Sequence, residues 1–180
     1  MNFQGAPLQV LTLVYLRVNG RVLMLKRAAD KKILPNAVSA PGGKVEPGED
    51  IYSAAVREYE EETGLTPLAL NLRGSYTFTT SDPYNPAGVI YIFTAEAFRG
   101  TFNPVSPDGA LNWLTPEEIM ANPAVMADHK VFLEPILNGT SHVCCMGQWR
   151  KEDNGSFTLL QWADSAAYYA ERTCQQEQAA

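Results

Sequence analysis

Three glutamates share one side of a predicted helix. Glu58, Glu61 and Glu62 stand in "VREYEEETGL" at positions i, i+3 and i+4, a spacing that brings side chains together on an α-helix. Two like charges about 5.5 Å apart repel by roughly 3 kcal/mol at an effective dielectric constant of about 20. Carboxylate oxygens without histidine or cysteine favour Mg²⁺ or Mn²⁺ over Zn²⁺. The pattern therefore indicates a divalent-cation site.

A solvated acidic face is the alternative, because that is the usual meaning of a run of charges. Exposed helices commonly place Lys or Arg four residues after an acid, yet Arg57 is the only base in this predicted helix. Magnesium keeps several waters and usually shares its coordination shell with substrate phosphates. The cation-site hypothesis therefore predicts a di- or triphosphate compound as the substrate.

The segment "APGGKVEPGED" comes directly before this helix and could serve the same site. Gly42 and Gly43 let the backbone pass close to a metal and a phosphate group, and Gly43 could offer its carbonyl. Lys44 can neutralise phosphate as a mobile point charge. A plain surface turn explains "EPGED" equally well, but not the whole spacing. The chain has neither a Walker-type phosphate loop nor a dinucleotide-binding glycine fingerprint.

Residues 43–65, "GKVEPGEDIYSAAVREYEEETGL", resemble the signature of the Nudix hydrolases. That signature reads Gly, five residues, Glu, seven residues, Arg-Glu, an aliphatic, any residue, Glu-Glu, any residue, Gly and an aliphatic. Every charged position and both glycines are present, and Tyr59 stands where an aliphatic is usual. The resemblance implies an α/β/α sandwich with a mixed sheet. It also implies hydrolysis of a nucleoside diphosphate linked to another moiety.

The same resemblance implies roles for individual residues. Arg57 would orient a catalytic glutamate, and Glu49 would support the geometry of the loop and the helix. The cofactor would be Mg²⁺ or Mn²⁺. The implied metal ligands are the Gly43 carbonyl, Glu58, Glu61 and Glu62.

Outside the signature, the chain resembles the Nudix subgroup that removes oxidised purine nucleotides such as 8-oxo-dGTP. The similar stretches are "LTLVYLRVNGRVLMLKR", "LNWLTPEEI" and the closing hairpin after residue 140. By position, Asp108 resembles a loop carboxylate that assists metal binding or water activation, and Asp128 an acid that reads an oxidised purine edge. Ala127 and Ser39 stand where the closest eukaryotic relatives carry a second acid and an asparagine, which leaves the base specificity open.

The hypothesis for the reaction is metal-assisted attack of water on phosphorus, which would release a nucleoside monophosphate and pyrophosphate from a triphosphate. Three carboxylates qualify as the general base, namely Glu58, Glu62 and Asp108. Arg27 and Lys44 are the candidate phosphate contacts, although Arg27 could equally be a surface charge at the end of a strand.

A slot between strands could hold the purine through the polar groups of Thr12, Ser39 and Asp128, with Phe78 or Trp113 stacking on the base. Both aromatic residues could instead be part of the core, and Asp128 could be only a helix N-cap. Two rival functions stay open. One is hydrolysis of ADP-ribose or another nucleoside diphosphate derivative, and the other is nucleotide sensing without turnover.

The elements that must position these residues can be read from the hydrophobic pattern. Apolar runs around "NG" predict a hairpin over residues 8–27. A helix is predicted from Asp50, a good N-cap, to Thr63, with Gly64 placed to stop it. "RGSYTFTT" and "GVIYIFTAEAF" read as strands joined by residues 81–88, which could cover the site or merely connect the strands.

The second half of the chain predicts more helix and a further hairpin. Thr115 caps a helix that has Pro116 in its first turn and Glu118 completing a capping box. "DHKVFLEPILNG" is a weaker helix prediction because Pro135 lies late in it. "HVCCMGQWR" and "SFTLLQW" predict the closing hairpin, followed by a polar tail that could fray.

Length and composition favour one α/β domain over residues 1–180, because 46% of the 180 residues are hydrophobic and 19% are charged. The formal net charge of −6 argues against charge-driven binding to duplex nucleic acid or anionic membranes. The sequence shows no membrane-spanning stretch and no signal segment, which predicts a cytoplasmic location. Three cysteines without metal-finger spacing predict reduced thiols. The expected partner is a small nucleotide, and the pattern does not predict an oligomeric state.

Overall fold

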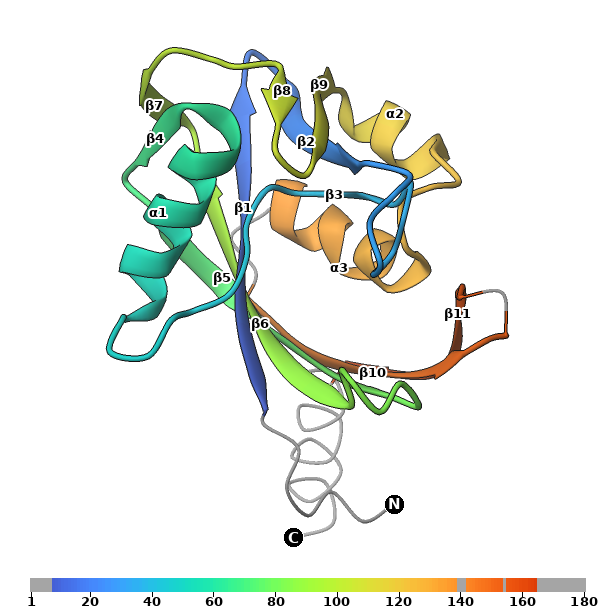
Figure 1. The fold of residues 1–180 in the computed structure, drawn as a ribbon. Coiled ribbons are helices and arrows are strands. Elements are labelled where there is room, and N and C mark those ends of the chain that lie inside the picture. Colours follow the sequence, from blue (N-terminus) through green and yellow to red (C-terminus); the bar gives the residue numbers. More distant parts are fainter. Residues whose placement is uncertain (1–7, 139–141, 154, 165–180) are drawn as a thin grey trace, which may run out of the picture.

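The computed structural model of the chain describes residues 8–138, 142–153 and 155–164 (Figure 1). The helices are α1 (Ile51–Thr63), α2 (Pro116–Ala121) and α3 (Ala127–Asn138). The strands are β1 (Gln9–Val18), β2 (Arg21–Arg27), β3 (Val38–Ser39), β4 (Leu65–Leu68), β5 (Asn71–Thr80), β6 (Ala87–Ala95), β7 (Ala97–Gly100), β8 (Val105–Ser106), β9 (Gly109–Leu114), β10 (Val143–Lys151) and β11 (Phe157–Asp164).

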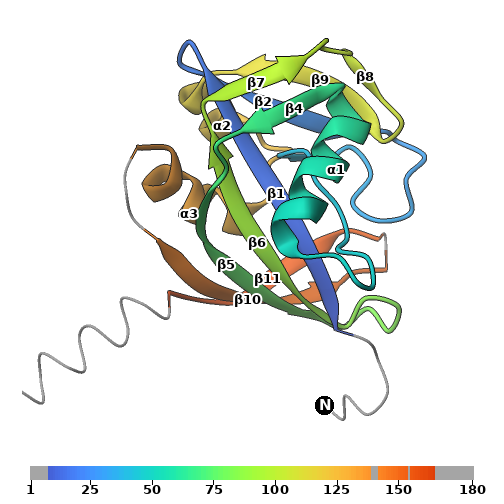
Figure 2. The same ribbon diagram turned by 90° about the vertical axis from the view of Figure 1, so that its left-hand side faces the viewer.

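Nine of the described strands form one mixed sheet. Its order is β11-β10-β5-β6-β1-β2-β9-β8, with β3 paired to β2, while β4 and β7 form a separate two-stranded sheet. The pairs β1–β6 and β10–β5 are parallel, and the other pairs of the large sheet are antiparallel. Helix α1 lies on one side of β1 and α3 on the other, as Figures 1 and 2 show.

Side chains of β1 alternate between the two faces, as expected for a strand. Val14 and Leu16 join the buried cluster that packs under α1, whereas Leu13 and Tyr15 belong with the cluster that includes Phe132 of α3. The sheet is therefore covered by helix on both faces. The predicted α/β/α sandwich with a mixed sheet is confirmed.

The first hairpin opens almost immediately after its turn. Asn19 and Gly20 both have positive φ, 50° and 75°, as the "NG" turn requires. Only Arg17 and Val18 then pair with β2. Further along, the edge of β1 bonds instead to residues 41–45, where the Val14 N–H donates to the Pro41 carbonyl at 3.0 Å. The glycine segment is thereby attached to β1.

Helix α1 has both of the predicted ends. The Asp50 carboxylate accepts hydrogen bonds from the backbone N–H groups of Tyr52 and Ser53. Gly64 ends the helix in the left-handed conformation, with φ of 72°, and its N–H donates to the Glu60 carbonyl at 2.8 Å. These local signals fix which face of the helix carries the glutamates.

The weaker helix prediction over "DHKVFLEPILNG" is confirmed as α3, which continues through Pro135 because its apolar residues Leu133, Ile136 and Leu137 are buried, and this packing outweighs the lost backbone bond. Other elements differ from the sequence expectation. The strand predicted over "GVIYIFTAEAF" ends at Ala95 and is followed by the separate strand β7. Strands β3, β4 and β8 were not predicted, since two to four residues show no usable alternation.

The connection between β5 and β6 is fastened to β10. The Lys151 ammonium contacts the buried Asp82 carboxylate at 3.0 Å, and the Lys151 N–H donates to the Ser81 hydroxyl at 2.9 Å. Among the described residues, Cys144 is an exposed free thiol, and the buried Cys145 donates from its Sγ to the Ser75 carbonyl at 3.9 Å, while Cys174 lies outside the described ranges. None of the described helices has the length and apolar character that a membrane span needs.

Candidate active site

Two glycines bring the backbone directly against α1. The Gly42 N–H donates to Oε2 of Glu62 at 2.8 Å. Gly42 has φ of 147°, and a Cβ there would lie 2.1 Å from the Thr12 carbonyl oxygen. A Cβ on Gly43 would lie 2.3 Å from Oε2 of Glu58. Only glycine fits at position 42, because the clash there is with backbone, whereas a side chain at position 43 would displace the Glu58 carboxylate. Glu58 and Glu62 thus both meet the Gly42–Gly43 backbone.

The Gly43 carbonyl, expected as a metal ligand, accepts the Thr12 N–H at 2.8 Å. A carbonyl oxygen has two lone pairs, so this bond leaves one for a cation. The same bond holds the carbonyl in a fixed position beside β1.

Arg57 joins the loop to the helix. Its Nε and Nη2 donate to the two carboxylate oxygens of Glu49, both at 2.9 Å, and Nη2 also donates to the Lys44 carbonyl at 3.0 Å. Its Nη1 lies 3.0 Å from Oε1 of Glu58. The hydrogen bond from Arg57 lowers the pKa of Glu49, and the same bond is the main cause that raises the pKa of Arg57. The guanidinium therefore stays charged and orients the Glu58 carboxylate.

Glu62 is the buried carboxylate of the site, with 8% of its surface exposed. Its pKa is raised to about 7, mainly by burial and also by the negative charges of Asp108 and Glu58, while the Gly42 N–H and the charge of Arg27 oppose the shift. The ionised carboxylate of Glu62 is thus not fully balanced by the positive groups around it. A divalent cation would supply it, and the oxygen donors present are of the kind that Mg²⁺ and Mn²⁺ prefer.

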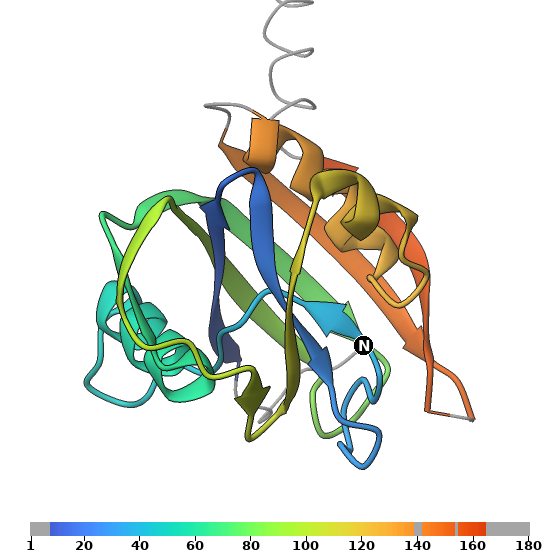
Figure 3. The same cartoon turned by 90° about the horizontal axis from the view of Figure 1, so that it is seen from above.

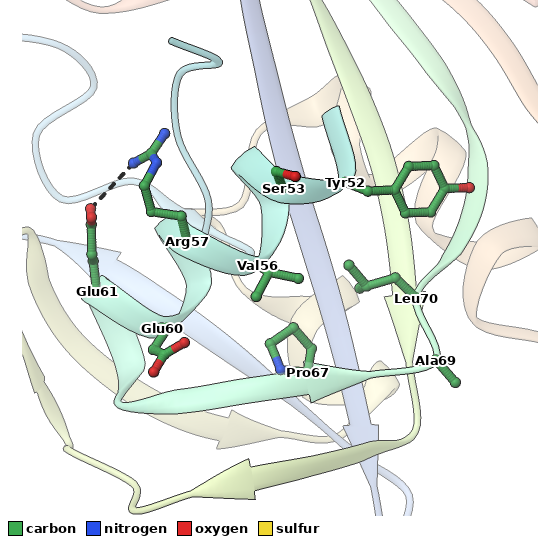
Figure 4. A pocket seen from close by; sticks show the side chains of 9 residues that line it. All are labelled: Tyr52, Ser53, Val56, Arg57, Glu60, Glu61, Pro67, Ala69 and Leu70. Atoms are coloured by element: carbon green, nitrogen blue, oxygen red, sulfur yellow. Dashed lines mark hydrogen bonds and ion pairs between the residues drawn. The ribbon is translucent and has the colours of Figure 1, made fainter. Parts of the chain in front are cut away.

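Glu61 lies apart from this pair. Its side chain is 60% exposed and contacts Nη1 of Arg57 at 3.3 Å. It lines a cavity of ≈ 890 Å³ on the outer side of α1, together with Tyr52, Val56 and Leu70 (Figure 4). Neither Glu58 nor Glu62 lines that cavity. Among the residues that the structure describes, no three Asp, Glu, His or Cys side chains converge as a metal site.

Asp108 lies in the turn between β8 and β9 and is paired with two bases. Nζ of Lys31 donates to its Oδ1 at 2.5 Å, and Nη1 of Arg27 donates to its Oδ2 at 3.4 Å. The structure therefore brings Asp108 and Arg27, both sequence candidates, to the side of the site near Glu62. Lys31 was missed, because a pair separated by 77 positions leaves no local signal.

The candidate purine-binding residues are distributed over both faces of the sheet. Thr12 is fully buried on the α1 face, and its hydroxyl has no hydrogen-bond partner among the described residues. Ser39 pairs with Leu25, a residue of the α1-side cluster, and its hydroxyl donates to the Ala40 carbonyl at 3.1 Å. Phe78 packs instead with the α3-side cluster. The structure does not bring these three side chains into one slot.

The remaining candidates lie elsewhere. Trp113, the alternative stacking residue, packs against Phe102 in the α1-side cluster, with ring centroids 6.1 Å apart, on the opposite face of the sheet from Phe78. Asp128 lies in the first turn of α3, and its side chain falls outside the described part of the structure. Lys44 is exposed beside the loop. The α3 face thus offers Phe78 and the start of α3, while the α1 face offers the carboxylates.

Together, the helix-covered mixed sheet and the glycine loop bonded to an acidic helix define a Nudix-type α/β/α sandwich. The model of the NUDIX domain family matches residues 7–134, and the chain belongs to this family. The resemblance carried by residues 43–65 is thereby confirmed.

Similar proteins carry different functional names. The chain is 33% identical over 91 residues to the Nudix hydrolase YvcI of Bacillus subtilis, covering 49% of this chain and 58% of that protein. It is 38% identical over 65 residues to the 8-oxo-dGTP diphosphatase of Escherichia coli and, over an equal length, to the ADP-ribose pyrophosphatase of Methanocaldococcus jannaschii. These two matches cover 36% of this chain and 50% and 37% of the relatives. The chain thus spans somewhat more than half the length of the first of these relatives and half or less of the other two.

Among solved structures, the fold is similar to that of a MutT protein from Bacillus halodurans. The TM-score is 0.73 at 26% sequence identity, and the match covers 88% of this chain and 99% of that chain. This similarity extends well beyond the signature and includes most of the sheet.

Proposed function

We propose that this chain is a cytoplasmic hydrolase of nucleoside triphosphates that uses Mg²⁺ or Mn²⁺ and releases a nucleoside monophosphate and pyrophosphate. An oxidised purine nucleotide such as 8-oxo-dGTP is the proposed substrate. One observation carries the proposal: the buried Glu62 and the neighbouring Glu58 meet at the Gly42–Gly43 backbone with cationic side chains close by. That arrangement suits a cation and a phosphate chain together.

A divalent cation bound by Glu58 and Glu62, with the Gly43 carbonyl as a further ligand, would offset phosphate charge and lower the pKa of the attacking water. Glu61 would join these ligands only by leaving its contact with Arg57. Other groups of the chain hold the two carboxylates in place. Arg57 fixes the Glu58 carboxylate, and the Gly42 N–H fixes that of Glu62.

The phosphate chain would be bound by Arg27, the last residue of β2, and by Lys44, an exposed residue that follows Gly43. A proton from water would be accepted by Glu58, Glu62 or Asp108, and the charges of Glu58 and Asp108 both act on Glu62. Arg27 already lies beside Asp108, with 25% of its side chain exposed. It is therefore available to an incoming anion.

The purine is the less constrained part of the proposal. The identity with an 8-oxo-dGTP diphosphatase supports an oxidised purine triphosphate, but an equal identity supports ADP-ribose. Asp128 and the partly buried Phe78 are the proposed base contacts on the α3 side. Thr12 and Ser39 lie on the other face of the sheet and are left out of this proposed contact. A sensing module without turnover is the third candidate, which the intact acidic positions of α1 disfavour.

The test is a substrate panel with purified protein and Mg²⁺, followed by Mn²⁺. We would measure kcat/KM for 8-oxo-dGTP, dGTP, other nucleoside triphosphates and ADP-ribose, and identify the products. The highest kcat/KM for 8-oxo-dGTP with release of pyrophosphate supports the proposal. Preference for ADP-ribose keeps the metal site and refutes the purine assignment. Binding of nucleotide without any turnover supports the sensing module.

A further inference from the structure

The carboxylate of Asp108 is shared by two positive side chains. Lys31 binds one of its oxygens and Arg27 the other. All three side chains are partly exposed, at 29%, 25% and 34% for Lys31, Arg27 and Asp108. One negative charge thus faces two positive charges at a surface that a solute can reach. The cluster carries a surplus positive charge, which an anion would balance.

The ammonium group of Lys31 is not needed to hold the two connections together. The Ala28 N–H donates to the Asp108 carbonyl at 2.9 Å, and Arg27 Nε donates to the Ile33 carbonyl at 3.1 Å. The Asp108 N–H is satisfied by the Ser106 hydroxyl at 3.1 Å. The Ala28–Asp108 backbone bond, beside the β2–β9 pairing of Arg27 with Gly109, therefore already joins the loop after β2 to the β8–β9 turn, so the ammonium group of Lys31 is left for another role.

The cluster lies next to the proposed metal ligands. In Figure 3 the β8–β9 turn lies between α1 and the loop after β2, and β8 packs against α1. The charges of Asp108 and Arg27 both act on Glu62, in opposite directions. A phosphate chain bound at Glu58 and Glu62 would therefore extend toward Lys31 and Arg27.

We propose that Lys31 is a further phosphate-binding residue and that Asp108 is its partner only while no nucleotide is bound. Substrate phosphate would take Lys31 and Arg27 away from Asp108, because phosphate oxygens carry more charge and accept more hydrogen bonds than one carboxylate. Asp108 would then be released toward Glu62 and the attacking water. This inference rests on the proposed hydrolysis of a nucleoside polyphosphate. It adds Lys31 as a residue that binds Asp108 without nucleotide and binds phosphate when nucleotide is present.

The competing explanation is an ordinary surface ion pair, which contributes little to stability and nothing to nucleotide binding. The two explanations differ for Lys31→Gln. Lys32→Gln is the matched control, because it removes the same charge from the next residue, which is exposed. Lys31→Arg restores the charge at the same place.

The first experiment measures binding of inorganic pyrophosphate with Mg²⁺ by calorimetry, which requires no turnover. Loss of a charge-assisted hydrogen bond should weaken binding by about tenfold in Lys31→Gln. Lys32→Gln should stay within about twofold of the native chain, and Lys31→Arg should recover most of the loss. KM for the best substrate should rise by a similar factor in Lys31→Gln. Equal binding by Lys31→Gln and Lys32→Gln would overturn the assignment of Lys31.

A second experiment tests the release of Asp108. Without nucleotide, Lys31→Gln frees Asp108 and should bind Mn²⁺ about threefold more tightly than Lys32→Gln, a difference of the size that a modest charge interaction gives. Adding Asp108→Asn to both variants should abolish that difference. If the difference persists in Asp108→Asn, Asp108 is not the group released.

Failure of the proposed function is recognised separately. If the native chain neither hydrolyses the nucleotide panel nor binds pyrophosphate with Mg²⁺ or Mn²⁺, both the function and the role of Lys31 are refuted. If the native chain hydrolyses a nucleotide and only the Lys31 comparison fails, the function stands and this inference alone is refuted.

Discussion

The backbone N–H of Gly42 and the carboxylate of Glu62 form a 2.8 Å hydrogen bond between the glycine loop and α1. The residues are 20 positions apart in the chain. Because Gly42 is also pressed against the Thr12 carbonyl, the bond fixes Glu62 relative to β1 as well as to the loop. The buried acid of the site is therefore held by main-chain geometry.

Replacing Gly42 by Ala should be costly. The new Cβ would lie 2.1 Å from a backbone oxygen at a φ of 147°, so the loop would have to move. We expect a loss of about 3 kcal/mol in the free energy of unfolding, measured by urea denaturation. Gly48→Ala is the control, because Gly48 also has positive φ but has nothing within 4 Å of its new Cβ. Its expected cost is about 1 kcal/mol, and an equal cost at the two positions would contradict the steric explanation.

Glu62 should make the metal-free protein less stable as the pH rises. Its pKa is about 7 in the folded protein, mainly because of burial, against an ordinary value of 4.5. The folded state therefore binds this proton more tightly than the unfolded state. Its contribution is full below about pH 4.5 and is lost as the pH rises to about 7, by up to roughly 3 kcal/mol.

The measurement is urea denaturation from pH 5 to pH 8 with a chelator, for the native chain and for Glu62→Gln. Glu49 and Asp50 have lowered pKa values, so they act in the opposite direction at lower pH in both proteins. As the pH rises, the free energy of unfolding of the native chain should fall relative to that of Glu62→Gln. A pH-independent difference would show that Glu62 is already charged at pH 5.

The hydroxyl of Tyr59 should be dispensable for folding. Tyr59 is fully buried, and its hydroxyl has no hydrogen-bond partner among the described residues. Tyr59→Phe should be neutral or up to about 1 kcal/mol more stable. In Tyr76→Phe, the comparison variant, Trp149 Nε1 loses a 2.7 Å acceptor, so a loss of about 1–2 kcal/mol is expected. Thermal unfolding of both variants checks this, and a loss in Tyr59→Phe matching that of Tyr76→Phe would refute the prediction.

Glu62→Gln should abolish hydrolysis and leave the fold intact. A neutral amide cannot replace the charge that the proposed cation needs, so we expect a fall in kcat of at least about 1,000-fold. Glu60→Gln on the same helix is exposed and should keep native kcat. Turnover with the preferred nucleotide and circular dichroism check the two variants together. Native turnover in Glu62→Gln would exclude it as a metal ligand.

Local signals explain why much of this fold was predictable. The "NG" turn, the Asp50 cap and the Gly64 stop each act within a few residues, and all three appear where the sequence places them. The fixed spacing of residues 43–65 likewise predicts that the glycine loop and the acidic helix meet. Short strands such as β3 and β8 carry no such signal, because two residues cannot show a period.

The parts that could not be predicted depend on tertiary geometry. Lys31 and Asp108 meet because the loop after β2 bonds to the β8–β9 turn, and neither residue stands in a recognisable motif. Thr12 and Phe78 face opposite sides of the sheet, which follows from the pairing register rather than from residue type. The helical spacing alone also does not show that Glu61 is exposed and pairs with Arg57, because that depends on where the side chains lie in the folded structure.

The attachment of residues 41–45 to the open edge of β1 divides the site into a fixed wall and an adjustable wall. The fixed wall consists of residues 41–45, which are hydrogen-bonded to β1 and so extend the central sheet. These residues can move only if the strand and the hydrophobic core beneath it move as well. The opposite wall is made of two surface connections held by ion pairs and a few backbone bonds. Mutations that retune substrate choice should therefore accumulate in the second wall, while the first tolerates almost no change.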